Sequence, residues 1–225
     1  MRVFYVVYPE DPAIRAWLNL LRVLANPHEK EPAHVTVRGP YRQRYRLPAD
    51  SHAVRGTTVH VPGADAFLGE RQCTVILRCE AEQLRSLWRK PDYPGFTPHL
   101  TICDGLPRAL SEEILAIARA IPPFSFRASA LTPIFTKPKQ TALGLLQAID
   151  DALLTDIAGA PLHAERLLRM NTVDRLLLLR NVVARAPTRL GASGVSSSPP
   201  VFSALSSPVS TVRSAGGQKD DATRH

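Results

Sequence analysis

Two four-residue segments of the chain share one pattern, a histidine, an apolar residue, a threonine and a second apolar residue. They are His-Val-Thr-Val at 34–37 and His-Leu-Thr-Ile at 99–102, and they lie 65 residues apart. Side chains alternate between the two faces of a β-strand, so the histidine and threonine of each segment face away from the aliphatic pair. If the two strands lie side by side, two imidazoles and two hydroxyls meet on one surface.

That set of groups suits the opening of a cyclic phosphodiester, which needs a base to activate water and an acid to protonate the leaving oxygen. Histidine serves either role near neutral pH, and we expect His34 and His99 to be this pair. The hydroxyls of Thr36 and Thr101 can donate to the phosphate oxygens on which charge builds. This chemistry requires no metal ion and no cofactor.

Basic residues follow the first motif. Arg38 comes directly after it, and no acidic residue occurs between Pro32 and Ala49. By strand alternation Arg38 shares the face of His34 and Thr36, so it is a candidate phosphate ligand. Three further arginines follow, for which solvated loop positions are the alternative to phosphate binding; these are Arg42, Arg44 and Arg46.

Aromatic residues occur in the segments that flank the motifs. Tyr41, Tyr93 and Phe96 are candidates for stacking on a nucleobase, although aromatic side chains also anchor loops. Cys103 shares the face of His99 and Thr101 by alternation, which predicts a position at the edge of the site. We expect it not to be a nucleophile, because no dedicated base accompanies it.

The elements that must hold these motifs form a strand–helix–strand unit that occurs twice. Asp11 and Pro12 predict the start of the first helix, as N-cap and first helical residue. Apolar periodicity predicts strands at 3–8, 33–38, 57–61, 73–79, 99–103 and 124–132, and helices at 12–24, 81–90 and 110–121. Each motif therefore lies on the second strand of its unit.

Composition separates the rest of the chain from residues 1–140. Residues 141–186 read as a helical extension, and residues 187–225 as a disordered tail with nine serines. The net charge of the chain is +8, and residues 1–140 carry 19 basic against 13 acidic side chains. This excess suits an anionic partner, although it also serves general solubility. The sparse cysteines and the apparent lack of a signal peptide or membrane span favour the cytoplasm.

The paired motifs resemble the two signature motifs of the 2H phosphoesterase superfamily, which includes RNA 2′,5′-ligase-like proteins and cyclic nucleotide phosphodiesterases. The resemblance covers about residues 1–135. It implies an α+β fold in which two pseudo-symmetric lobes of antiparallel strands pack on helices around a central cleft. It also implies that His34 and His99 are the acid/base pair and that Thr36 and Thr101 bind phosphate.

The expected activity is hydrolysis of a 2′,3′-cyclic phosphate or of a 2′,5′-linked or cyclic nucleotide. Two alternatives remain: ATP-independent joining of RNA 2′,5′-ends, and a catalytically inactive module that binds RNA or nucleotides. Which histidine is the acid, the exact substrate and the oligomeric state stay open. The helices after residue 141, with Leu176–Leu179, offer either a partner interface or a surface that packs on the catalytic core.

Overall fold

The computed structural model describes residues 2–42, 49–70, 72–89, 95–135, 144–145, 151–159 and 161–185. All of them belong to one compact unit. The strands are β1 (Val3–Val7), β2 (Val35–Tyr41), β3 (Thr58–Leu68), β4 (Cys73–Glu80), β5 (His99–Leu106), β6 (Phe124–Arg127) and β7 (Thr132–Phe135). The helices are α1 (Pro12–Ala25), α2 (Arg108–Ala118), α4 (Asp151–Ala158), α5 (Ala164–Arg169) and α6 (Thr172–Arg185), with 3₁₀ turns η1 (Ala49–Val54) and η2 (Glu82–Leu84).

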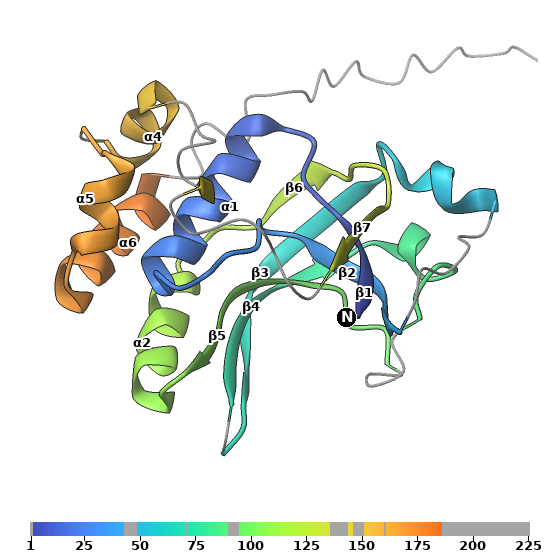
Figure 1. Ribbon diagram of the computed structural model, residues 1–225, viewed down its shortest axis with the longest axis horizontal. Coiled ribbons are helices and arrows are strands. Elements are labelled where there is room, and N and C mark those ends of the chain that lie inside the picture. Colours follow the sequence, from blue (N-terminus) through green and yellow to red (C-terminus); the bar gives the residue numbers. More distant parts are fainter. Residues whose placement is uncertain are drawn as a thin grey trace, which may run out of the picture. The chain divides into compact units, whose positions relative to one another are not determined.

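The seven strands form one antiparallel sheet in the order β6-β3-β4-β5-β2-β1-β7. The α+β class is therefore confirmed, and the strands that carry the two motifs, β2 and β5, are neighbours inside the sheet. The described helices gather to one side of the strands, while the long β3–β4 hairpin extends at the lower centre of the view (Figure 1).

Helix α1 begins as its sequence predicts. The Asp11 carboxylate accepts hydrogen bonds from the backbone N–H groups of Ala13 (2.7 Å) and Ile14 (3.2 Å), and Pro12 is the first helical residue. These bonds satisfy two of the amide groups that a helix start otherwise leaves without partners. The helix therefore has a defined start, which sets where its buried face meets the sheet.

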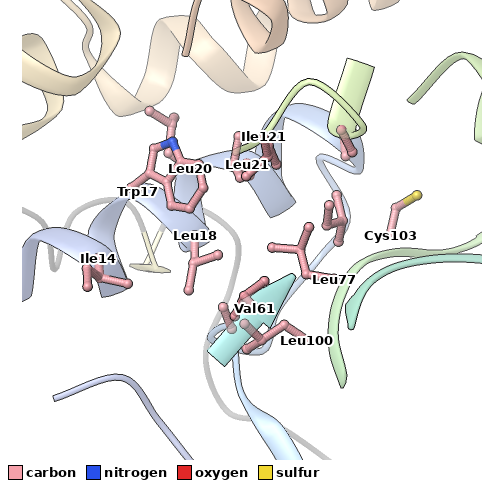
Figure 2. Close-up of a cluster of buried hydrophobic side chains, with 14 of the residues drawn as sticks. Ile14, Trp17, Leu18, Leu20, Leu21, Val61, Leu77, Leu100, Cys103 and Ile121 are labelled. Carbon is pink, nitrogen blue, oxygen red and sulfur yellow. The ribbon is translucent and has the colours of Figure 1, made fainter. Parts of the chain in front are cut away.

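The core lies between this helix and the sheet. Figure 2 shows Leu18 of α1 directed toward Val61 and Leu100 of the strands, while Leu21 lies beside Ile121 and Trp17 lies farther from these strand residues. Burying a side chain of this size stabilises the fold by about 1.5–3 kcal/mol. The aliphatic positions of both motifs belong to this core, as alternation predicts; they are Val35, Val37, Leu100 and Ile102.

The prediction of a helix over residues 81–90 is wrong beyond the first turn. Only Glu82–Leu84 form a 3₁₀ turn, and the chain then unwinds. Arg89 instead pairs with β2, because its N–H donates to the Val37 carbonyl (3.2 Å) and its carbonyl accepts from the Gly39 N–H (2.9 Å). Backbone pairing with a motif strand thus overrides the local helical pattern, although Leu84 and Leu87 are buried as expected.

The single strand expected over residues 124–132 is divided into two. β6 pairs with β3 at one edge of the sheet and β7 pairs with β1 at the other edge. Between them, the Ser129 N–H donates to the Tyr8 carbonyl (2.7 Å) and the Glu10 N–H donates to the Arg127 carbonyl (2.8 Å). Because one short segment reaches both edges, the sheet must be strongly curved.

The helices after residue 150 pack on the rest of the unit. α6 contacts α1 and α2, and the Trp17 indole N–H donates to the Val182 carbonyl (3.4 Å). Leu176 and Leu179 are buried, whereas Leu177 is 52% exposed. Part of the leucine cluster therefore covers the core, which was one of the two alternatives for this segment. The tail at 187–225 lies outside the described residues.

Candidate functional site

The register between β2 and β5 brings the two motifs together. Val35 pairs with Leu100 in antiparallel orientation, which places His34 level with Thr101 and Thr36 level with His99. The paired Val35 and Leu100 are at most 1% exposed, so the histidines and threonines occupy the opposite face. All four of these side chains are half-buried. The sheet thus brings onto one patch the groups that the sequence places on separate strands.

Both histidine rings are oriented by the same kind of contact. Nδ1 of His34 lies 2.7 Å from the carbonyl oxygen of Pro32, and Nδ1 of His99 lies 2.8 Å from that of Thr97. A carbonyl oxygen only accepts hydrogen bonds, so each Nδ1 carries the hydrogen and Nε2 holds the lone pair of the neutral ring. Each imidazole can therefore accept a proton at Nε2 as a base or, once protonated, donate one there as an acid.

Arg38 is buried, with 4% of its surface exposed. Its Nε donates to the Tyr41 hydroxyl (3.3 Å), and the Tyr41 ring lies edge-on to Tyr5 with centroids 6.2 Å apart. The residue after Arg38 is a glycine in the left-handed region, at φ +104°, where a Cβ atom would lie 2.7 Å from the Val3 carbonyl oxygen. Gly39 thus permits the close approach of β2 to β1 that holds Arg38 and Tyr41 in place.

The other expected aromatic residues differ in their placement. Phe96 is half-buried, lies edge-on to Trp88 (5.2 Å between centroids) and carries the Arg85 guanidinium 4.4 Å above its ring. These contacts favour the loop-anchoring alternative for Phe96, and its role in substrate binding stays a prediction. Tyr93, like Arg44 and Arg46, lies outside the described residues, and Arg42 is exposed.

The expected position of Cys103 at the edge of the site is wrong. A register shift lies between the pairs Val75–Cys103 and Ile76–Thr101, and this bulge turns the Cys103 side chain into the core. Burial raises the pKa of its thiol to about 11. Cys103 is therefore protonated at neutral pH and inaccessible, in agreement with the expectation that it is not a nucleophile.

Two polar residues of α1, which the sequence reasoning missed, support both motifs from behind the sheet. Asn19 Oδ1 accepts from the Ala33 N–H (2.7 Å), directly before His34. Arg22 donates to the carbonyl of Glu31 (3.1 Å) and to the carbonyl of Thr101, and it pairs with the Glu29 carboxylate (2.9 Å).

Asn19 and Arg22 are nearly inaccessible to solvent, with 6% and 4% of their surfaces exposed. Through them, α1 holds the segment whose Pro32 carbonyl orients His34, and the same guanidinium holds the strand of the second motif. The signal in the sequence was that three polar residues of a mostly apolar helix, Arg15, Asn19 and Arg22, recur four and three positions apart, hence on one stripe of its surface.

Each histidine also contacts an aromatic ring outside its own motif. Tyr8 lies edge-on to His34 with centroids 6.1 Å apart, and Phe67 lies edge-on to His99 with centroids 5.6 Å apart. Burial, reinforced by the charge of Glu31, raises the pKa of Tyr8, so its phenol stays neutral and can donate a hydrogen bond. Neither contact follows from sequence spacing, because each joins segments far apart in the chain.

Arg78 is a further cation of the site surface, carried by β4. It is the pairing partner of His99 across β4 and β5, so both side chains face the same way. Its guanidinium lies 3.9 Å from the Asp65 carboxylate, and the two side chains are 60% and 50% exposed. This exposed pair leaves little net charge beside His99.

Within the part of the chain that the structure describes, no three His, Cys, Asp or Glu side chains are grouped as metal ligands would be. None of the described helices combines the length and apolarity needed to cross a membrane. Comparison with protein-family models finds no match to the chain, and a search of curated proteins finds no relative with significant similarity.

Proposed function

We propose that this chain is a metal-independent phosphoesterase that hydrolyses a 2′,3′-cyclic phosphate, or a 2′,5′-linked or cyclic nucleotide. The observation that supports this most directly is the β2–β5 register, which gathers His34, His99, Thr36 and Thr101 on one face. The resemblance of both motifs to those of 2H phosphoesterases points the same way.

The chemistry follows from the positions of these groups. One neutral imidazole takes a proton from water through Nε2, and the water oxygen attacks phosphorus. The other imidazole, protonated beforehand, donates its Nε2 proton to the departing ribose oxygen. The threonine hydroxyls stabilise the negative charge that grows on the non-bridging phosphate oxygens. The role of Arg38 as a phosphate ligand stays a prediction, since its side chain is buried. Protons balance over the cycle, because the two histidines exchange protonation states and solvent restores them.

We also propose that the fold consists of two related lobes that meet between β2 and β5. The strand order supports this, since β1 flanks β2 just as β4 flanks β5. Each histidine uses the carbonyl two residues before it to hold its Nδ1 hydrogen, and each meets one aromatic ring. The cleft between the lobes would then present both histidines to one phosphate, and the helices after residue 150 would be an addition to this core.

The experiment is a substrate panel with the purified protein, in buffer with and without EDTA. The panel contains nucleoside 2′,3′-cyclic phosphates, 2′,5′-linked oligonucleotides and cyclic dinucleotides, and products are identified by mass spectrometry. We expect turnover that EDTA does not reduce. Replacing His34 or His99 by alanine should lower the rate about 10²- to 10⁴-fold. His60→Ala is the matched control, because His60 is an exposed histidine of β3.

Adding RNA fragments to the panel, together with a nucleotide-binding titration, separates the alternatives. Ligation of RNA fragments with 2′,3′-cyclic phosphate ends, without ATP, would assign the reverse reaction to the same residues. Nucleotide binding with no turnover of any substrate would point to an inactive binding module. Turnover that stops when EDTA is added would overturn the proposal, and so would turnover that survives both histidine substitutions.

A further inference from the structure

Phe67 lies at the end of β3, in the hairpin that joins β3 to β4, and 49% of its surface is exposed. Among the Phe, Tyr and Trp side chains that the structure describes, it is the one classed as exposed; the others are buried or half-buried. Exposing a large flat apolar ring forgoes the free energy that its burial would provide. Because the ring also contacts His99, its exposed part is available to a substrate bound at the candidate site.

The position of this ring follows from strand pairing and sheet curvature. Asp65 pairs with Ile76 of β4, and Ile76 pairs with Thr101 of β5. Phe67, two residues after Asp65 on β3, shares the face that carries Thr101 and His99. The curved hairpin brings its ring to 5.6 Å from the His99 ring, in an edge-on arrangement. The ring thus stands at the rim of the site, with one part against His99 and the rest in solvent.

The charges around Phe67 indicate what kind of group could bind there. Arg78 and Asp65 face the same surface and form a weak, exposed ion pair at 3.9 Å, so they largely neutralise one another. A second phosphate would find little net attraction, whereas an uncharged heteroaromatic ring can stack on Phe67. The His34 side differs, because Tyr8 there is half-buried and its backbone is bonded to Ser129 through both its N–H and its carbonyl.

We propose that Phe67 is the nucleobase platform of the site, which makes a nucleoside phosphate, rather than a base-free phosphodiester, the substrate class. The base stacks on the exposed part of the Phe67 ring while its phosphate lies between His34 and His99. This assignment rests on the proposed phosphoesterase function. It also places the nucleoside on the His99 side of the site.

The test compares adenosine 2′,3′-cyclic phosphate with base-free ribose 2′,3′-cyclic phosphate as substrates. Phe67→Ala should raise KM for the adenosine substrate about 5- to 150-fold, the range expected for loss of one base–aromatic stack. It should leave KM for the base-free substrate unchanged. Phe67→Tyr keeps a flat ring and should behave like the parent, whereas Phe67→Leu keeps an apolar cover but should behave like the alanine variant. Leu68→Ala is the matched control, since Leu68 is the next residue of the hairpin, is also exposed, and points to the opposite face.

Failure of this inference is distinguishable from failure of the proposed function. Equal KM increases for both substrates would show that Phe67 only orders His99 or covers Ile76, and unchanged KM values would remove it from the site. If neither substrate is turned over, binding of adenosine 3′-monophosphate and ribose 3-phosphate is titrated calorimetrically. Tighter binding of the adenosine ligand that Phe67→Ala weakens would support the platform without catalysis. Equal binding of both ligands, or no binding of either, would overturn it.

Discussion

Replacing Arg22 by methionine removes the group that ties α1 to both motifs while keeping a long, apolar side chain. In the native structure this guanidinium bonds to the carbonyls of Glu31 and Thr101 and pairs with the Glu29 carboxylate. We expect two separate effects. The free energy of unfolding should fall, and kcat should fall because the His34 ring is held less firmly. Each effect has its own measurement.

The size of the stability loss follows from burial. The Arg22 side chain is 5% exposed and that of Glu29 is 16% exposed, so the substitution removes the Arg22 donor from two carbonyls and leaves the poorly solvated Glu29 carboxylate with only the backbone N–H groups of Lys30 and Glu31. Breaking a buried pair in this way costs about 3–5 kcal/mol. Because a domain is stable by about 5–15 kcal/mol, the variant should fold but unfold at a clearly lower urea concentration. Arg108→Met is the control, since Arg108 forms an exposed ion pair on α2.

A second substitution separates the effect on kcat from the effect on stability. Adding Glu29→Gln to Arg22→Met removes the stranded negative charge, so it should restore part of the unfolding free energy. It does not restore the bonds to Glu31 and Thr101, so kcat on the cyclic phosphate should stay low. Arg22→Lys keeps the charge but lacks the planar array of donors, and it should lose about 1–3 kcal/mol.

The His34 ring supplies a readout that does not depend on turnover. Nitrogen NMR shifts of His34 report which ring nitrogen carries the hydrogen, and we expect Nδ1 in the parent because of its contact with Pro32. In Arg22→Met the segment before His34 loses one of its two tethers to α1, so the Nδ1–H tautomer should become less populated. Unchanged His34 shifts and full kcat, in a variant that loses less than about 1 kcal/mol, would refute the reasoning.

Three further predictions concern the motifs and their surroundings. Thr36→Val and Thr101→Val should each lower kcat about 100-fold or more through loss of a donor to phosphate; circular dichroism checks the fold, and full activity would exclude the proposed role. Gly39→Ala should cost about 1–3 kcal/mol, measured by urea unfolding, because its φ is +104° and a Cβ would meet the Val3 carbonyl. Burial raises the pKa of the Cys103 thiol to about 11, so the thiol is protonated at pH 8. It should therefore resist iodoacetamide at pH 8 until denaturant is added. Rapid labelling of Cys103 in the native protein, mapped by mass spectrometry, would contradict its buried position.

Much of the local structure is predictable from the sequence because its causes are local. A period of two residues separates His34 and Thr36 from Val35 and Val37, whichever strand lies beside them. Asp11 and Pro12 define the start of α1 through bonds within the first turn of the helix. The α+β class, the elements that carry the motifs and the shared face of the histidine and threonine in each motif follow from such short-range rules.

Other features depend on tertiary structure because they join residues distant in the chain. Arg22 contacts Thr101 across 79 positions, and no periodicity encodes that pair. Strand pairing unwinds the expected helix at Arg89, and a bulge in β5 turns Cys103 from the site into the core. Register, bulges and sheet curvature are set by how all seven strands pack together. The sequence by itself therefore determined which side chains are candidates for the proposed chemistry. The packing of strands and helices decided which of them meet, with α1 behind the motifs and Phe67 beside His99.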